Sequence, residues 1–144
     1  MADKYGSNKG KFQLAYEYFW KLLVPKSGRS EYPEGELLRW VSKYYYRYNN
    51  DGDTYEDCQE HCGFPDICKI KDINNKVLDK IDIYLCREEY DKAVDETLKY
   101  IMLKHSKEDK VWNPLTNRLV SISNPIGQNA LKLLDCKLTY TNIL

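Results

Sequence analysis

The stretch Pro33–Asp57, PEGELLRWVSKYYYRYNNDGDTYED, decides the fold of this chain, because it encodes an amphipathic helix together with the signals that begin and end it. Pro33 suits the first turn of a helix, where no intrahelical bond needs its missing N–H. Glu34 and Glu36 in that turn complement the positive end of the helix dipole. The run Asn49–Gly52 then ends the helix, since Asn and Gly tolerate the left-handed conformation.

Two stripes of side chains run along this predicted helix. Apolar and aromatic residues recur at the spacing of one helix face, which we expect to be buried: Leu37, Leu38, Val41, Tyr44, Tyr45 and Tyr48. The cations Arg39, Lys43 and Arg47 follow one another at i, i+4 and i+8 on the other side. The sequence therefore predicts a helix with one buried face and one basic face.

Apolar spacing and capping signals predict helices in the rest of the chain as well. The predicted ranges are 9–24, 53–62, 70–84 and 90–105, with a last helix that begins after an Asn124 cap. The second of these opens with a capping box of Asp53 and Glu56. Residues 111–122 allow a small β-hairpin. We therefore predict a mainly α fold, a compact single-domain bundle of about five to six helices over residues 1–144.

The first helix, 9–24, is predicted to lie at the centre of the fold. Ser7 or Asn8 is expected to cap it. One apolar stripe recurs at helical spacing: Phe12, Tyr16, Phe19 and Leu23. A second stripe is expected to widen the buried face: Leu14, Tyr18 and Leu22.

Charge and composition limit the classes of partner. The formal net charge is zero, but residues 49–66 carry six acids and no Lys or Arg. A dedicated DNA-binding domain would show a basic excess, which this chain lacks. Thirteen tyrosines are more than a core of this size needs, and such an excess is typical of hydrated interfaces. The simplest interpretation of the charge pattern is that acids and cations of the chain neutralise one another.

The expected location is the cytoplasm. The N-terminal residues MADKYGSNKGKFQ lack the apolar segment of a signal peptide. The most apolar run, Tyr16–Val24, contains Glu17 and Lys21 and is too short to span a bilayer. The cysteine count, five, is odd. We therefore expect a soluble protein with reduced thiols and no membrane contact.

A cysteine-rich segment is the only candidate for a metal site. Cys58, His61, Cys62 and Cys68 are all chemically competent zinc ligands. Their spacing matches neither paired CxxC motifs nor a zinc finger, and the adjacent His61 and Cys62 cannot easily face one metal. Reduced cysteines that behave as small hydrophobic residues are the simpler interpretation, so we predict no metal and no cofactor. A zinc-stabilised adaptor stays open as an alternative.

Familiar catalytic motifs are missing from the sequence. It contains no GxSxG, no GxxxxGK(S/T), no GxGxxG and no HExxH. Its two histidines, His61 and His105, belong to no familiar nucleophile motif, and the acidic stretch around His61 lacks the basic surroundings that activate a cysteine thiol. We therefore predict that the protein is not an enzyme.

The basic stripe and the acidic turn after it are the candidate partner-binding surface. The candidate residues are Arg39, Lys43, Arg47, Tyr46, Asp51, Asp53 and Asp57. Three cations on one helix face could follow a phosphate backbone, with Trp40 or Tyr46 stacked on a base. They could equally contact an acidic protein surface. The carboxylates, for their part, could occupy a basic groove that normally holds nucleic acid.

One further indication comes from a resemblance. The run Gly35–Arg39, the tyrosine-rich helix and the run Asn49–Asp53 resemble a pattern in small, poorly characterised proteins of phages and mobile elements, over about Val24 to Asp57. Such proteins often act stoichiometrically on host machinery, and inhibitors of CRISPR effectors are a prominent class among them. The resemblance implies an anti-CRISPR-like inhibitor whose partner is a protein or ribonucleoprotein. A direct RNA-binding module is the alternative, and the oligomeric state is left open.

Overall fold

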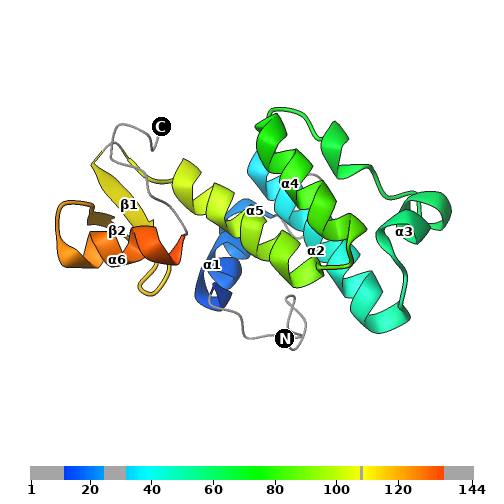
Figure 1. Ribbon diagram of the computed structural model, residues 1–144, viewed down its shortest axis with the longest axis horizontal. Helices are drawn as coiled ribbons and strands as arrows, with labels where there is room; N and C mark the ends of the chain where they lie inside the picture. The colour runs from blue at the N-terminus through cyan, green and yellow to red at the C-terminus, as the bar shows by residue number, and fades with distance from the viewer. Residues whose placement is uncertain (1–11, 25–31, 108, 135–144) are drawn as a thin grey trace. The chain divides into compact units, whose positions relative to one another are not determined.

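The computed structural model describes residues 12–24, 32–107 and 109–134. In chain order its elements are α1 (Gln13–Leu23), α2 (Pro33–Asp51), α3 (Tyr55–His61), the 3₁₀ turn η1 (Ile67–Lys69), α4 (Asn75–Cys86), α5 (Tyr90–Lys104), β1 (Lys110–Asn113), β2 (Arg118–Ser121) and α6 (Pro125–Leu133) (Figure 1). The predicted fold class, mainly α with a small hairpin, is confirmed. Within the described residues, no helix has both the length and the apolar composition needed to cross a lipid bilayer.

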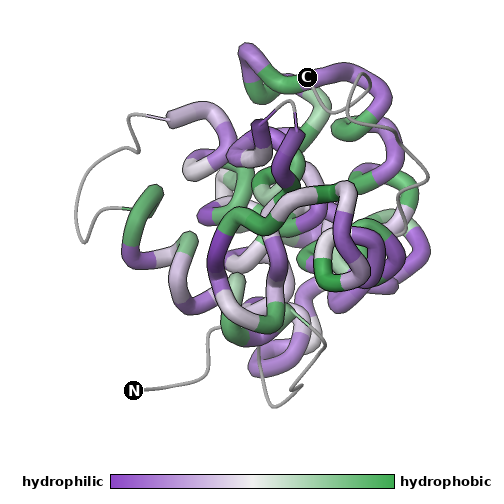
Figure 2. Tube along the Cα trace, turned by 90° about the vertical axis from the view of Figure 1, so that its left-hand side faces the viewer, coloured by the Kyte–Doolittle hydropathy of each residue, from purple (hydrophilic) through white to green (hydrophobic). Residues whose placement is uncertain are grey.

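The chain divides into two units, Met1–Thr97 and Leu98–Leu144, so that α5 begins in the first and ends in the second. In the first unit, α2 packs against α1, α3 and η1. Hydrophilic and hydrophobic residues alternate along the helical turns, as expected of amphipathic helices (Figure 2). In the second unit, α6 packs against both strands of the hairpin.

The buried face of α2 is the one that its sequence predicts. Its fully or nearly fully buried apolar and aromatic side chains are Leu37, Leu38, Val41, Tyr44 and Tyr45, and Tyr48 is half-buried. At the contact with α1, the Tyr16 hydroxyl donates a hydrogen bond to Ser42 Oγ at 3.1 Å, which satisfies both buried hydroxyl groups. Gly52, with φ +73°, ends the helix as predicted.

The prediction for the first helix is only half right. Phe12, Tyr16, Phe19 and Leu23 are buried, as predicted. The stripe that was expected to widen this face is instead exposed: Leu14, Tyr18 and Leu22. The reason is geometric, because one face of α1 packs on α2 and residues at the other helical positions face away. The predicted caps, Ser7 and Asn8, lie outside the described residues.

Two predicted helix starts are shifted. The capping box of α3 consists of Thr54 and Asp57 rather than Asp53 and Glu56. The Thr54 hydroxyl accepts a hydrogen bond from the Asp57 N–H. In return, the Asp57 carboxylate accepts one from the Thr54 N–H. The helix expected from residue 70 begins at Asn75. Asn74 caps it by accepting the Lys76 N–H at 2.8 Å.

The second unit contains the predicted hairpin. β1 and β2 pair antiparallel, with Val111 opposite Val120. Asn124 caps α6 by accepting the Gly127 N–H at 2.9 Å, and Pro125 occupies the first turn, both as predicted. Gly127 is buried against the hairpin, where an added Cβ would collide with the carbonyl group of Ser121.

Gly127→Ala should therefore destabilise the protein by about 1–3 kcal/mol, because the new methyl group meets backbone that cannot rotate away. Denaturant unfolding of the variant would measure this loss. Asn129→Ala, at an exposed position of the same helix, is the control and should change the free energy of unfolding by less than about 0.5 kcal/mol. Equal stability of Gly127→Ala and the native chain would contradict the described contact.

Candidate functional site

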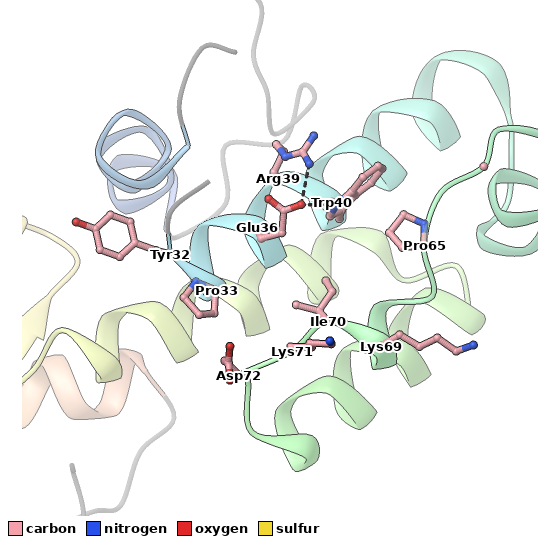
Figure 3. A pocket seen from close by; sticks show the side chains of 11 residues that line it. Tyr32, Pro33, Glu36, Arg39, Trp40, Pro65, Lys69, Ile70, Lys71 and Asp72 are labelled. Atoms are coloured by element: carbon pink, nitrogen blue, oxygen red, sulfur yellow. Dashed lines mark hydrogen bonds and ion pairs between the residues drawn. The ribbon is translucent and has the colours of Figure 1, made fainter. Parts of the chain in front are cut away.

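A groove of about 780 Å³ lies between the N-terminal half of α2 and the segment Gly63–Asp72 (Figure 3). Glu36, Arg39 and Trp40 line it from α2. Pro65 and Ile70 line it from the facing segment, together with three charged residues: Lys69, Lys71 and Asp72. Neither Lys69 nor Lys71 forms an ion pair with any described residue. The groove therefore combines an apolar surface with exposed positive charge.

The facing segment is held in place by buried tyrosines. The Tyr44 hydroxyl on α2 donates a hydrogen bond to the carbonyl oxygen of Pro65. Burial raises the pKa of Tyr44, so this hydroxyl stays protonated and can donate. The Tyr55 hydroxyl accepts the Ile67 N–H at 3.1 Å, and the Asp66 carboxylate caps η1 through the Cys68 N–H at 3.0 Å. The segment is thus positioned by backbone hydrogen bonds before any ligand binds.

One carboxylate organises the α2 side of the groove. Glu36 Oε2 accepts from Arg39 Nη2 at 2.8 Å and from Trp40 Nε1 at 2.9 Å. The Arg39 guanidinium lies 4.7 Å and the Lys43 ammonium 4.9 Å from the Trp40 ring centroid, and Phe64 contacts the same ring edge-on. The indole is therefore in contact with several residues of its own chain, and the Glu36 carboxylate stabilises this arrangement through its two hydrogen bonds.

The predicted basic stripe does not form a continuous row of available cations. Arg39 is only 17% exposed in its ion pair with Glu36. Arg47 pairs with Asp51 at 3.4 Å and with Asp53 at 2.6 Å, and its hydrogen bond to Asp53 raises the pKa of Arg47. Two of the three cations are thus neutralised within the chain. Lys43 alone of the three is exposed and has no carboxylate partner among the described residues.

The remaining candidate residues differ in their exposure and in their bonding partners. Tyr46 is 55% exposed, as a binding residue would be. Asp51 and Asp53 form the ion pairs with Arg47. Asp57 caps α3, and the Thr54 N–H bound to its carboxylate lowers the pKa of Asp57. These three carboxylates therefore have local structural roles, and the structure does not gather them into one acidic surface with Tyr46.

Sequence reasoning did not identify Lys69 and Lys71 as site residues. The apolar spacing of Ile70, Ile73 and Val77 predicts a helix from residue 70, which would place Lys71 on a solvated helix face and Lys69 just before the first turn. The sequence nevertheless contains residues that indicate an irregular segment at this place. Gly63 and Pro65, with the Asp66 side chain as a turn acceptor, are typical of an irregular segment that would present its cations differently.

The four predicted metal-ligand candidates do not come together in one cluster. Cys58 and Cys62 lie beside Asp53, with their ligand atoms within 4.8 Å of one another. Cys68 belongs to a separate group with Asp66 and Asp82. The His61 side chain is 75% exposed and lies 3.8 Å from the Glu60 carboxylate. The alternative of one site built from all four residues is therefore wrong for the described conformation.

Comparison with protein-family models, with curated proteins and with solved structures finds no match to this chain. The resemblance to proteins of phages and mobile elements therefore stays a sequence-based expectation. The functional proposal rests on the groove and the residues that line it.

The pairing of Glu36 with Arg39 can be measured by a double-mutant cycle. Glu36→Gln keeps an acceptor for the Trp40 N–H but removes the charge, and Arg39→Met keeps an aliphatic side chain. We expect a coupling of about 1 kcal/mol in the free energy of unfolding, because the pair is largely buried and hydrogen-bonded. The matched control is Lys92 with Glu89, whose lysine is 57% exposed, and its coupling should stay below about 0.5 kcal/mol.

Proposed function

We propose that this protein is a non-enzymatic binding protein that recognises an acidic segment of a protein partner through the groove between α2 and Gly63–Asp72. The observation that carries this proposal is the charge around the groove. Lys69 and Lys71 line the groove and are exposed, and Lys43 lies beside the lining residue Trp40. These three lysines outnumber the one exposed acid of the lining, Asp72, whereas Arg39 is neutralised by Glu36. Lysines at the rim of a groove attract and orient an acidic partner.

The shape and chemistry of the groove favour a polypeptide as the ligand. Its apolar lining includes two prolines, Pro33 and Pro65, together with Ile70. Prolines restrict the backbone, so this surface loses little conformational entropy when a partner binds. An extended segment with apolar and acidic side chains would match both the lining and the lysines.

The surroundings of Trp40 argue against base stacking as the main mode of binding. Proteins that bind single-stranded nucleic acid offer aromatic faces to successive bases. Trp40 already has Arg39 and Lys43 against its ring and Phe64 at its edge. A base could stack on this indole only by displacing contacts that the chain makes itself.

The wider setting follows from the resemblance described above. Within this proposal the partner is a host or defence nucleoprotein in the cytoplasm, and a CRISPR effector is the specific case that the resemblance implies. Nucleic acid then belongs to the partner's own complex. Inhibition would be stoichiometric, since the protein acts by occupying a surface rather than by turnover.

A direct RNA-binding module is the second candidate, and one observation favours it. Tyr46 is 55% exposed on the same helix as Lys43, so one cation and one aromatic side chain are available together. This candidate predicts an RNA affinity that falls by roughly 0.7 log units per log unit of salt for each phosphate contacted. Gel-shift titrations at several salt concentrations would measure that slope, and no mobility shift at low salt would eliminate this candidate.

The test of the leading proposal is the triple variant Lys43→Glu, Lys69→Glu and Lys71→Glu. It should lose the partner while leaving the fold intact, because these exposed lysines form no ion pair with the described residues. Affinity purification from the native host, with nuclease treatment of half of each sample, would measure retention. We expect a protein partner that survives nuclease treatment with the native chain and disappears with the variant.

A matched variant with the same change in charge at other exposed lysines controls for net charge: Lys76→Glu, Lys110→Glu and Lys132→Glu. It should retain the partner. Equal retention by both triple variants would show that the groove is not the binding surface. The CRISPR-specific form of the proposal is tested separately, by adding purified protein to effector cleavage assays at increasing molar ratios. Unchanged cleavage across a panel of effectors would remove it.

A further inference from the structure

We propose that Asp53, Cys58 and Cys62 form a site for a thiophilic divalent cation of the zinc class, and that this cation displaces the guanidinium of Arg47 from Asp53 and Cys62. The site is separate from the groove and does not rest on the proposed function. It also differs from the set of four ligands considered from the sequence, since it includes Asp53 and excludes both His61 and Cys68.

The ligand atoms converge because of how α3 begins and ends. Cys58 and Cys62 are four residues apart, so their side chains project from the same side of the helix. Asp53 immediately precedes the Thr54 cap, which brings its carboxylate alongside them. All three ligand atoms lie within 4.8 Å of one another. This arrangement places two thiols and one carboxylate around a common point.

Only a small contraction would give metal-binding geometry. In a tetrahedral zinc site with Zn–S bonds of about 2.3 Å, the two sulfur atoms are about 3.8 Å apart. The required shift is therefore at most about 1 Å. The backbone at the end of α3 is held by the Cys62 and Phe64 N–H groups, which both donate to the Cys58 carbonyl, but the Cys62 side chain is only half-buried, unlike that of Cys58. Cys62 is thus the ligand that can move.

The position of Arg47 is the independent sign that this point attracts a cation. Its Nη2 atom lies 2.6 Å from Asp53 Oδ2 and 3.3 Å from Cys62 Sγ. One positively charged group thus bridges two of the three proposed ligands. Its Nη1 atom also lies 3.4 Å from Asp51, so Arg47 keeps a carboxylate partner after it is displaced.

The chemistry of the site suits a metal that prefers sulfur. Binding would release one proton from each thiol to solvent and form two metal–sulfur bonds and one metal–oxygen bond. Cys58 is completely buried, so a bound metal would be shielded from water on that side. A divalent cation supplies the charge that stabilises two neighbouring thiolates. A water molecule would complete a four-coordinate site.

The second mixed cluster in the described part of the chain serves as the internal control. It contains Asp66, Cys68 and Asp82. The Tyr55 hydroxyl lies within donating distance of both carboxylates, 3.1 Å from Asp66 and 2.7 Å from Asp82, so the two share one hydroxyl donor. With one thiol in the group, this cluster is a poorer match for a thiophilic ion.

Titration of the full-length protein with Co(II) tests the site directly, because thiolate–cobalt bonds give a charge-transfer absorption band. We expect this band to saturate at one equivalent and to disappear when Zn(II) is added. The double variant Cys58→Ser with Cys62→Ser should lose the band. The control Cys68→Ser with Cys86→Ser should keep it, and Cys136 is retained in both.

Two further variants keep the proposal testable if the buried Cys58→Ser change impairs folding. Cys62→Ser alone, at a half-buried position, should weaken the band, because one of two thiolates is lost. Arg47→Met should tighten Co(II) binding severalfold, because it removes the competing cation. No thiolate band in the native chain, or an unchanged band in the Cys58 and Cys62 variants, would overturn the site. Unchanged affinity in Arg47→Met would overturn the displacement of Arg47.

Discussion

The hydrogen bond from the Tyr44 hydroxyl to the Pro65 carbonyl is the interaction on which the first unit of this protein depends. It joins the buried face of α2 to a segment that has little regular structure of its own. The Tyr44 ring also contacts Tyr55 and Phe64 edge-on, with ring centroids 4.8 and 5.1 Å away. One side chain thus fixes α3 and the irregular segment against α2, and this attachment holds the two sides of the groove in position.

Local signals predicted most of the secondary structure. The stripes of α2, the end of that helix at Gly52 and the start of α6 at Asn124 each depend on residues within one or two helical turns, so neighbouring residues suffice to specify them. The error at the start of α3 arose because two neighbouring residues could each cap the helix. Asp53 and Thr54 are both good caps, and Thr54 is chosen because Asp53 instead pairs with Arg47 across the turn. That choice depends on tertiary structure.

The candidate site was less predictable for the same physical reason. A row of cations at helical spacing indicates a basic face only if nothing else in the chain reaches it. The left-handed residue Gly52 turns the backbone so that Asp53 returns to Arg47, and Glu36 reaches Arg39 from the preceding turn. Lys69 and Lys71 were overlooked because their role follows from a contact between residues far apart in the sequence. Helical spacing shows which side chains share a face, but not which of them stay available for a partner.

The enclosure of Trp40 has a spectroscopic consequence. An anion lies at its indole nitrogen, while two cations lie close to its ring. Charges at such short range impose a strong, directed electric field on the chromophore, and the energy of an excited indole depends on that field. Any acidic ligand that draws Lys43 or Arg39 away from the ring would change this field and shift the wavelength of Trp40 fluorescence emission. The chain also contains Trp20 and Trp112, so a variant that keeps Trp40 alone would report the occupancy of the groove without an attached label.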